Sequence, residues 1–370
     1  MPKSSAPFVP QPLTILGAGA VGLFLAAGVR VAFPNYPLRV LMREELFVSR
    51  MDGQVVTVCL QQSRGPSTLV DADARHNARL VHIPARTVTR VCATPRPKKP
   101  VQNLILTTKA FQAKAALESV RSILALRRDT TDDKPTAVTN IVWLGNGALA
   151  VRDELESYLA QAVNDQASHL ACTLHLGILT YGVYRLRGDD METVVHAGQG
   201  QIVLSNHKTA FLAELWDRAG LNTTTVDQAE LERLLWYKLA ANCVINPLTA
   251  LYAVSNGNVA DRVPDFNHTM RSIVDEIVTV QNAMVGTVRN SEPLEAEAVE
   301  AFVHQVMRET ARNQSSMWRD VQASRQTEID YLNGYVVRQG QAWGIPCPVN
   351  EKLVNAIRKL QPPSLPNTPL

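Results

Sequence analysis

The sequence has 370 residues, of which 46% are hydrophobic and 19% are charged, and its formal net charge is +3. A chain of this length exceeds what one hydrophobic core usually holds, so two domains are expected. The small net charge and the scattered basic residues exclude the broad basic surface of many nucleic-acid-binding proteins, and the short basic run at residues 96–100 is interpreted as a solvated loop.

Residues 1–12 are polar and rich in proline, and they contain neither the apolar core of a signal peptide nor an arginine. This composition predicts a disordered lead-in. No apolar run in the sequence is long enough to span a bilayer. We therefore expect a cytoplasmic protein without a membrane partner, and a mitochondrial location stays open.

A glycine-rich turn follows the first predicted strand, at residues 13–16. Its sequence is Gly17-Ala18-Gly19-Ala20-Val21-Gly22, and an alanine-rich helical segment comes next. In such a strand–turn–helix unit the first glycine permits the tight turn and the second lets the backbone approach a pyrophosphate. The third glycine lets the helix pack closely against the strand, and the helix N-terminus offers N–H groups to the phosphates. The pattern predicts a dinucleotide site.

The next predicted strand, residues 38–42, leads into Arg43. A NAD-binding unit usually has an acidic residue near this point, which binds the 2′-hydroxyl of the ribose. An arginine fork instead matches the 2′-phosphate of NADP. The sequence therefore favours NADP, with an ordinary surface arginine as the alternative interpretation.

Two polar residues follow buried strands further along the chain. Residues 54–60 and 80–91 alternate loosely and are predicted as strands, and residues 103–108 form a clearly buried strand that leads into Lys109 and a helix. The predicted strand 137–144 leads into the turn Gly145-Asn146-Gly147 and another helix. Ligands bind open α/β sheets at the carboxyl ends of their strands, so we expect Lys109 and Asn146 to share one site.

The remaining segments divide the chain into two domains. Long strands at 169–184 and 192–204 are predicted to form a hairpin, and a helix at 207–220 and a strand at 222–226 complete the sheet. Later segments have helical periodicity. We predict a Rossmann-type dinucleotide-binding domain at 13–226, an all-α substrate and catalytic domain at 227–361, and a flexible tail at 362–370. The predicted fold class is therefore α/β, with an all-α C-terminal domain.

One predicted helix of the second domain carries polar residues on or beside an apolar face. Lys238, Asn242 and Asn246 recur every fourth residue, and Pro247 is expected to end the helix. Such groups are costly to bury unless they are paired. A snorkelling lysine at a helix edge is one explanation, but three polar residues in register favour a row that faces a substrate. The apolar residues recur at helical spacing: Leu231, Leu234, Leu235, Leu239 and Ile245.

Glu328 falls on a second apolar stripe, in the segment 310–340, if that segment is one helix. A carboxylate there must be paired, protonated or exposed to a cavity, and a structural ion pair is the alternative to a functional role. Lys238 is its expected partner across a cleft, and Ser316 and Asp320 flank it. Such a pair suits proton transfer coupled to hydride transfer. The stripe consists of Met317, Val321, Ser324, Tyr331 and Tyr335.

The cysteines are odd in number and widely spaced, with no CxxC pair and no cluster with histidines. This spacing predicts neither a disulfide framework nor a metal site, and it fits a reducing compartment. The five residues are Cys59, Cys92, Cys172, Cys243 and Cys347.

These features together resemble the ketopantoate reductase family (2-dehydropantoate 2-reductase) over residues 13–353. The resemblance rests on the glycine turn, on residues 236–250, and on residues 315–320 with 327–334. It implies Lys238 as the catalytic proton donor and Glu328 as a catalytic group that also contacts the cofactor. It implies substrate contacts at Asn146, Asn242, Asn246, Asn256 and Ser316. The cofactor contacts that it implies are Gly17, Ala18, Gly19, Ala20, Val21, Gly22, Arg43, Lys109, Asn146 and Glu328.

The family resemblance implies NADPH-dependent reduction of 2-dehydropantoate to (R)-pantoate, a step toward pantothenate and coenzyme A. The alternatives are a reductase of another branched 2-keto acid, or a non-catalytic NADP-binding sensor that would have no use for Lys238 and Glu328. The helical domain could also serve to form a homodimer. Two departures from the family pattern concern substrate range: Gly145 replaces a bulkier polar residue, and Thr180-Tyr181-Gly182 replaces Thr-His-Ala before a cofactor contact near Val183.

Overall fold

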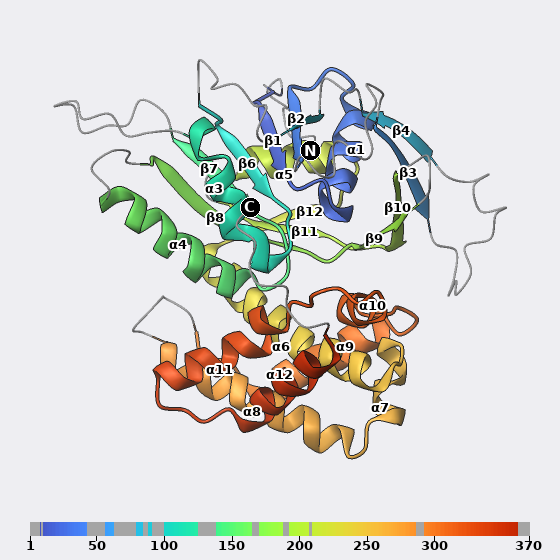
Figure 1. The fold of residues 1–370 in the computed structure, drawn as a ribbon, viewed down its shortest axis with the longest axis vertical. Helices are drawn as coiled ribbons and strands as arrows, with labels where there is room; N and C mark the ends of the chain where they lie inside the picture. The colour runs from blue at the N-terminus through green and yellow to red at the C-terminus, as the bar shows by residue number, and fades with distance from the viewer. Residues whose placement is uncertain are drawn as a thin grey trace, which may run out of the picture.

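The computed structural model describes residues 8, 10–42, 56–62, 79–83, 88–90, 100–124, 138–164, 170–187, 192–206, 209–285 and 292–361. Strands and helices alternate in the first part of the described chain, and helices alone form the second part (Figure 1). This arrangement confirms the predicted fold class. Of the described helices, none has the length and apolar character needed to cross a membrane.

The large sheet of the described chain has the strand order β12-β11-β8-β7-β6-β1-β2-β5. Its strands from β8 to β5 are parallel, whereas β11 runs antiparallel to β8. The register aligns Leu16, Leu106 and Trp143 at one edge, so the segments after these residues leave the sheet side by side. The strands are β1 (Leu13–Leu16), β2 (Leu38–Met42), β5 (Val88–Arg90), β6 (Asn103–Leu106), β7 (Thr139–Trp143), β8 (Cys172–Leu179), β11 (Ile202–Ser205) and β12 (Thr223–Val226).

Helices cover both faces of this sheet, which explains why its central strands are apolar throughout. Ile105 packs in one core cluster with α1 and α5, while its neighbours Leu104 and Leu106 pack in a second cluster that continues into the helical part. The helical elements of the sheet part are α1 (Ala20–Ala32), η3 (Ala110–Gln112), α3 (Ala113–Ser119), η4 (Arg121–Ile123), α4 (Ala148–Asn164) and α5 (Ala210–Arg218).

A smaller sheet packs against α1, with the described strand order β4-β3-β10-β9 (Figure 1). Its strands are β3 (Val56–Gln62), β4 (Arg79–Ile83), β9 (Gly182–Arg187) and β10 (Glu192–Gly198). The predicted hairpin is present as β9 and β10, but the two long strands predicted at 169–184 and 192–204 are wrong. Each divides between the two sheets, because the chain crosses itself at Gly200, where a Cβ atom would lie 2.4 Å from the backbone nitrogen of Tyr181.

The described residues at the start of the chain pack against the sheet part. The rings of Phe8 and Phe33 stack with centroids 5.8 Å apart, and the Tyr36 hydroxyl donates to the Gln11 carbonyl at 2.7 Å. Asn103 Nδ2 donates to the Pro12 carbonyl at 3.2 Å. The sequence predicts a disordered lead-in here, so the finding limits that prediction to residues 1–7 and 9, which lie outside the described residues together with the tail at 362–370.

The helical part is organised around α6 (Gln228–Tyr252), against which α8, α9, α10 and α12 pack. Asp227 caps its start by accepting a hydrogen bond from the Glu230 N–H at 2.8 Å. A buried ion pair joins α6 to the sheet part, with Arg152 Nη1 on α4 2.5 Å from Glu232 Oε2. The other elements are η5 (Asn256–Asn258), α7 (Val259–Arg262), α8 (Phe266–Met284), α9 (Ala296–Glu309), α10 (Ser316–Gln322), η6 (Ile329–Tyr331), α11 (Asn333–Ala342) and α12 (Pro348–Leu360).

The prediction that Pro247 ends its helix is wrong, because α6 continues through this residue to Tyr252. A proline has no N–H to donate to the carbonyl four residues earlier, which here belongs to Cys243. Asn333 of α11 supplies the missing donor, since its Nδ2 lies 3.0 Å from the Cys243 carbonyl oxygen. The helix thus passes its proline with this carbonyl satisfied.

The prediction of one helical stripe through Glu328 is also wrong. Helix α10 ends at Gln322, Ser324 has a φ of 49°, and the next helical turn begins only at Ile329. Glu328 lies in the irregular segment between them and is only 6% exposed. Its burial therefore comes from the path of this loop rather than from helical periodicity.

Candidate active site

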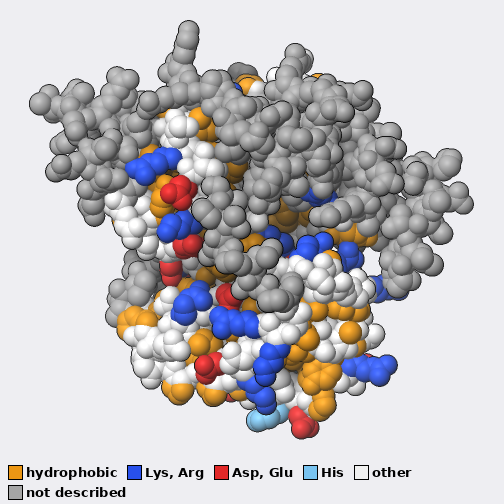
Figure 2. Space-filling view, viewed as in Figure 1, with side chains coloured by type: hydrophobic (Ala, Val, Ile, Leu, Met, Phe, Trp, Pro, Cys, Tyr) orange, Lys and Arg blue, Asp and Glu red, His pale blue; other side chains and the backbone are white. Residues whose placement is uncertain are grey.

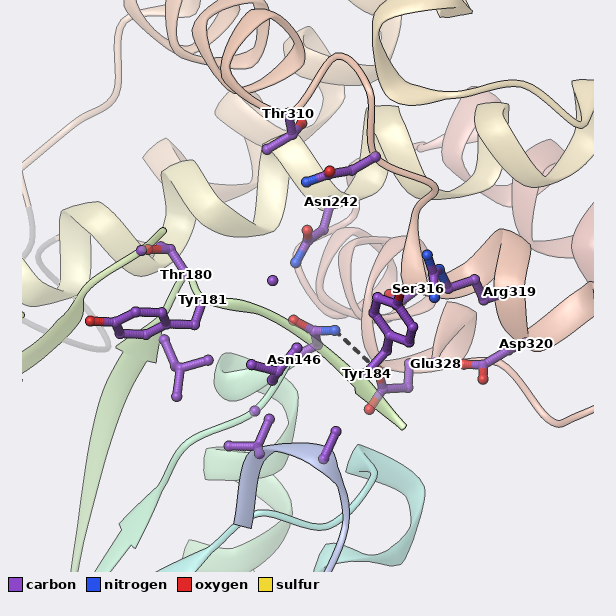
Figure 3. A pocket seen from close by; sticks show the side chains of 18 of the residues that line it. Asn146, Thr180, Tyr181, Tyr184, Asn242, Thr310, Ser316, Arg319, Asp320 and Glu328 are labelled. Carbon is purple, nitrogen blue, oxygen red and sulfur yellow. Dashed lines mark hydrogen bonds between the residues drawn. The ribbon is translucent and has the colours of Figure 1, made fainter. Parts of the chain in front are cut away.

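A cleft of about 2910 Å³ lies between the carboxyl edge of the large sheet and the helical part. The glycine turn, the segments after β6 and β7, and the connection from β8 to β9 line one wall, and α6, α10 and the end of α9 line the other (Figure 3). On the face drawn in Figure 2, Lys and Arg side chains lie along the boundary between the two parts. The cleft therefore has a backbone-rich wall and a wall of polar side chains.

The glycine turn has the geometry that a dinucleotide requires. Gly17 has a φ of 113°, and a Cβ atom at Gly22 would lie 1.9 Å from the Gly17 carbonyl oxygen, so both positions need glycine. Gly19 faces open space, with its nearest neighbour 4.0 Å from a Cβ position. Gly17, Ala18, Gly19, Ala20 and Val21 line the cleft at the start of α1, where unpaired N–H groups are available to phosphates. Arg43 lies outside the described residues.

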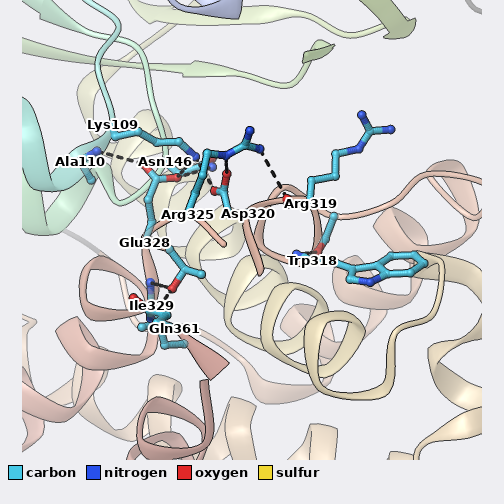
Figure 4. Close-up of polar contacts among 12 residues, drawn as sticks. Lys109, Ala110, Asn146, Trp318, Arg319, Asp320, Arg325, Glu328, Ile329 and Gln361 are labelled. Carbon is cyan, nitrogen blue, oxygen red and sulfur yellow. Dashed lines mark hydrogen bonds and ion pairs between the residues drawn. The ribbon is translucent and has the colours of Figure 1, made fainter. Parts of the chain in front are cut away.

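Lys109 and Asn146 leave neighbouring strands and meet at Glu328 (Figure 4). The Asn146 Nδ2 donates to Glu328 Oε2 at 3.2 Å, and the Ala110 N–H donates to Glu328 Oε1 at 2.9 Å. Lys109 Nζ lies 3.7 Å from Glu328 Oε2 and 2.7 Å from Asp320 Oδ2. Lys109 is thus the ion-pair partner of Glu328, in place of the expected Lys238.

The charges around Lys109 decide its protonation. Burial disfavours the ammonium, but the carboxylates of Glu328 and Asp320 outweigh this effect, so the pKa of Lys109 is raised above its usual value. Lys109 therefore stays positively charged at the edge of the sheet, beside the glycine turn. This network joins the two walls of the cleft, because Asp320 and Glu328 belong to the helical part.

Lys238 lies on α6 and lines the cleft. Its Nζ donates to the Leu179 carbonyl at 3.0 Å, and it makes no ion pair with a carboxylate of the described chain. Burial lowers the pKa of Lys238 to about 8, and the negative charge of Glu328 opposes this shift. An ammonium with such a pKa gives up its proton more readily near neutral pH than an ordinary lysine.

The other predicted substrate residues differ in their access to the cleft. Asn242 lines it one turn after Lys238, and the exposed Ser316 lines it at the first turn of α10. Asn246 is 7% exposed and does not line the cleft. Asn256 lies behind the lining: its Nδ2 donates to Thr310 Oγ1 at 2.9 Å, while its buried Oδ1 has no partner among the described residues. An unpaired buried amide oxygen is suited to a ligand that donates a hydrogen bond.

Helix α10 is held in place by a polar contact that sequence reasoning missed. Ser315 caps the helix by accepting from the Trp318 N–H at 3.0 Å, and its Oγ lies 2.6 Å from Thr249 Oγ1 on α6. The Leu179 carbonyl beneath Lys238 was missed as well. A backbone carbonyl has no signature in a sequence, and the Ser–Thr contact depends on the packing of two helices far apart in the chain.

The two departures from the expected family pattern have structural explanations. Gly145 lies over the buried Trp143, whose Cζ2 would be 2.6 Å from a Cβ atom at this position, so the tryptophan requires a glycine there. The Tyr181 ring packs against Phe24 with centroids 5.0 Å apart, and its hydroxyl accepts from the Asn222 N–H at 2.8 Å. Gly145, Tyr181, Gly182 and Val183 all line the cleft.

Comparisons with known proteins agree on one family. The chain matches the family model described as "Ketopantoate reductase PanE/ApbA" over residues 13–209, and the model described as "Ketopantoate reductase PanE/ApbA C terminal" over residues 230–361. The 2-dehydropantoate 2-reductase of Vibrio cholerae serotype O1 is 32% identical over 263 residues, which are 70% of this chain and 77% of that protein.

Solved structures show the same fold at lower identity. D-mandelate dehydrogenase, in a ternary structure with NADH and anilino(oxo)acetate, has a TM-score of 0.72 and 19% identity, over 95% of this chain and 98% of that one. The dimeric ketopantoate reductase of Staphylococcus aureus has a TM-score of 0.63 and 17% identity, over 95% of this chain and 99% of that one.

Proposed function

The chain belongs to the ketopantoate reductase family, and on this basis we propose that this oxidoreductase reduces 2-dehydropantoate to (R)-pantoate with NADPH, a step toward pantothenate and coenzyme A. The observation that carries the proposal is the position of Lys238. Its ammonium is held on the Leu179 carbonyl in a cleft that the glycine turn also lines, and its pKa is lowered to about 8.

Lys238 acts on the ketone oxygen of the substrate. NADPH, when bound, supplies the hydride that C2 of the keto acid accepts. Negative charge then develops on the ketone oxygen, and the Lys238 ammonium stabilises this charge and donates the proton. The negative charge of Glu328 favours the protonated form of Lys238, so Lys238 is mostly charged at neutral pH despite its burial.

The sheet wall holds the cofactor. The glycine turn and the N-terminus of α1 bind its phosphates, Lys109 adds a positive charge, and Arg43 selects the 2′-phosphate of NADPH. Glu328 fixes the Asn146 amide and the Lys109 ammonium at the strand ends by its contacts at 3.2 Å and 3.7 Å. These contacts support a role for both side chains beside the cofactor and the keto acid.

The helical wall holds the acid. Asn242 and Ser316, which line the cleft, contact the substrate directly, and Asn256 supports this wall from behind the lining by its contact with Thr310. Asn246 lies one turn deeper and supports this wall from below. Fixing both ends of a small substrate supplies a large part of the rate enhancement, because the ketone is held in a reactive orientation.

A reductase of another 2-keto acid is the second candidate. Gly145 favours it, because the Trp143 ring, which would lie 2.6 Å from a Cβ atom at Gly145, takes the place of the bulkier residue of the family pattern next to Asn146. The test is NADPH oxidation by purified protein with 2-dehydropantoate, 2-oxoisovalerate and benzoylformate, each over a range of concentrations. The highest kcat/KM with 2-dehydropantoate supports the first candidate, and a preference for another acid supports the second. NADPH binding without turnover of any acid would leave the sensor alternative.

A cytoplasmic homodimer completes the proposal. It is supported by the dimeric relative from Staphylococcus aureus and by the reducing compartment that the dispersed cysteines favour. Sedimentation equilibrium of the purified chain checks the assembly, and a monomer at micromolar concentration would rule it out.

A further inference from the structure

An arginine of the helical part lies on an aromatic ring of the sheet part at the border of the cleft. Arg319 Cζ is 3.8 Å from the centre of the Tyr184 ring, which is the spacing of a direct cation–π contact. Arg319 belongs to α10 and Tyr184 to β9, and both residues line the cleft (Figure 3). The contact therefore bridges the two parts at the lining of the cleft.

The guanidinium of Arg319 keeps its hydrogen-bond donors available. Nearby cations are already paired, because Lys109 and Arg325 lie 2.7 Å and 3.0 Å from the Asp320 carboxylate. In contrast, no acceptor among the described residues contacts the guanidinium of Arg319 (Figure 4). Stacking occupies the face of a guanidinium and leaves its N–H edge open. A planar fork held in this way matches the oxygens of a phosphate or a carboxylate.

The surroundings of Tyr184 indicate whether the Arg319 guanidinium binds a phosphate or a carboxylate. Arg185, the next residue of β9, donates from Nη1 to the Ala18 carbonyl at 3.0 Å, so this part of β9 lies beside the glycine turn. Helix α1, which follows the turn, also packs against β9. Lys238 contacts Leu179, in the preceding strand β8. The strand that carries the stack thus passes beside the glycine turn, where phosphates would bind, and Tyr184 projects from its opposite face toward α10.

We propose that Arg319 binds the pyrophosphate of the dinucleotide from the helical side of the cleft, with Tyr184 as the platform that orients its guanidinium. The inference rests on the proposed function, because it needs a dinucleotide at the glycine turn. The turn and Lys109 contact the phosphates from the sheet side, and Arg319 adds donors from the opposite side. A cofactor held from both sides draws the two parts together, so NADPH binding narrows the cleft around the keto acid.

The test is equilibrium binding of NADPH to the purified full-length chain, followed by nucleotide fluorescence without any keto acid. Loss of a charged hydrogen-bonding fork costs about 10- to 100-fold in Kd, so Arg319→Gln should weaken NADPH binding by that factor. Tyr184→Leu should weaken it less, because the fork remains but loses its platform, and Tyr184→Phe should match the wild type. Arg271→Gln is the matched control, since Arg271 pairs with glutamates on the helical surface.

A fragment without the pyrophosphate locates the effect. Arg319→Gln should leave the affinity for adenosine 2′-phosphate unchanged, and an equal loss for the fragment and NADPH would overturn the proposal. An unchanged Kd for NADPH would also overturn it, as would a raised KM for the keto acid alone. Arg319→Lys keeps the charge without the fork and should give an intermediate Kd. If the wild-type chain itself does not bind NADPH, the proposed function fails first.

Discussion

The two walls of the cleft are built in different ways. The sheet wall consists of the segments that leave β1, β6 and β7, and the register of these neighbouring strands brings Gly17, Lys109 and Asn146 to one edge. The helical wall consists of side chains from α6, α10 and an irregular loop. Lys238 and Glu328 belong to this second wall, and only tertiary packing brings them together.

This difference separates binding from chemistry. At the glycine turn the sheet wall presents backbone groups, so a substitution there acts by blocking the close approach of a phosphate. The helical wall presents ionisable side chains, so a substitution there acts on charge and proton transfer. Variants of the glycine turn should therefore change the affinity for the cofactor, and variants of Lys238 and Glu328 in the helical wall should change turnover.

The largest expected effect belongs to the helical wall. Lys238→Ala removes the proposed proton donor and should lower kcat by about 10²- to 10⁴-fold, while the Kd for NADPH stays unchanged. In the wild type, kcat should fall as the pH rises through about 8, because the ammonium then loses its proton. Steady-state kinetics across this pH range measures both effects. Turnover close to that of the wild type in Lys238→Ala would remove the lysine from the mechanism.

The second effect belongs to the sheet wall. Gly22→Ala would place a Cβ atom 1.9 Å from the Gly17 carbonyl oxygen, so the turn must open. We expect a loss of about 1–3 kcal/mol in the free energy of unfolding, as for other overpacked sites, together with weaker NADPH binding. Thermal unfolding and nucleotide fluorescence measure these changes. Gly334→Ala is the control, because its nearest neighbour would be 3.4 Å away, and an equal effect in both variants would refute the explanation.

A smaller and more specific effect tests the contact between the walls. Glu328→Gln removes a negative charge that raises the pKa of Lys238, so this pKa should fall further. The pH at which kcat declines should therefore move to lower values than in the wild type. A pH profile of kcat at saturating substrate decides the point. A profile that keeps its wild-type position would show that Glu328 acts only as a structural partner of Asn146 and Lys109.

The smallest expected effect on turnover comes from behind the helical wall. Asn333→Leu leaves the Cys243 carbonyl without a donor and should lower the free energy of unfolding by about 1–3 kcal/mol, with kcat per folded molecule unchanged. Adding Pro247→Ala restores an N–H for that carbonyl, so the double variant should recover part of the loss. Urea unfolding of the two single variants and the double variant measures this coupling. Strictly additive changes in the free energy of unfolding would contradict it.

Features that are local in sequence could be predicted from the sequence, and contacts that depend on tertiary packing could not. The family resemblance and the fold class are confirmed, because the glycine turn and the blocks at 236–250 and 315–334 that carry the resemblance are each local in sequence. The shared edge of Lys109 and Asn146 was predictable from the position of strand ends. The contact of Lys109 with Asp320 was not predictable, because it joins residues 211 positions apart and no local pattern encodes it. Glu328 was singled out through a helix that is absent, and its burial arises from the loop that begins at Ser324.

The buried ion pair between Arg152 and Glu232 fixes one end of α6 to the sheet part, whereas the other end contacts α10. The pair ties the first turns of the helix to the sheet part, and Lys238 follows Glu232 by ~9 Å along the axis, at the usual rise per residue. Thr249, which contacts the cap of α10, lies ~26 Å from Glu232 along the same axis. A rotation of α6 about this point would therefore move Thr249 about three times as far as the backbone of Lys238. The segment of α6 that carries Lys238 would then move much less than the end of the helix that contacts α10.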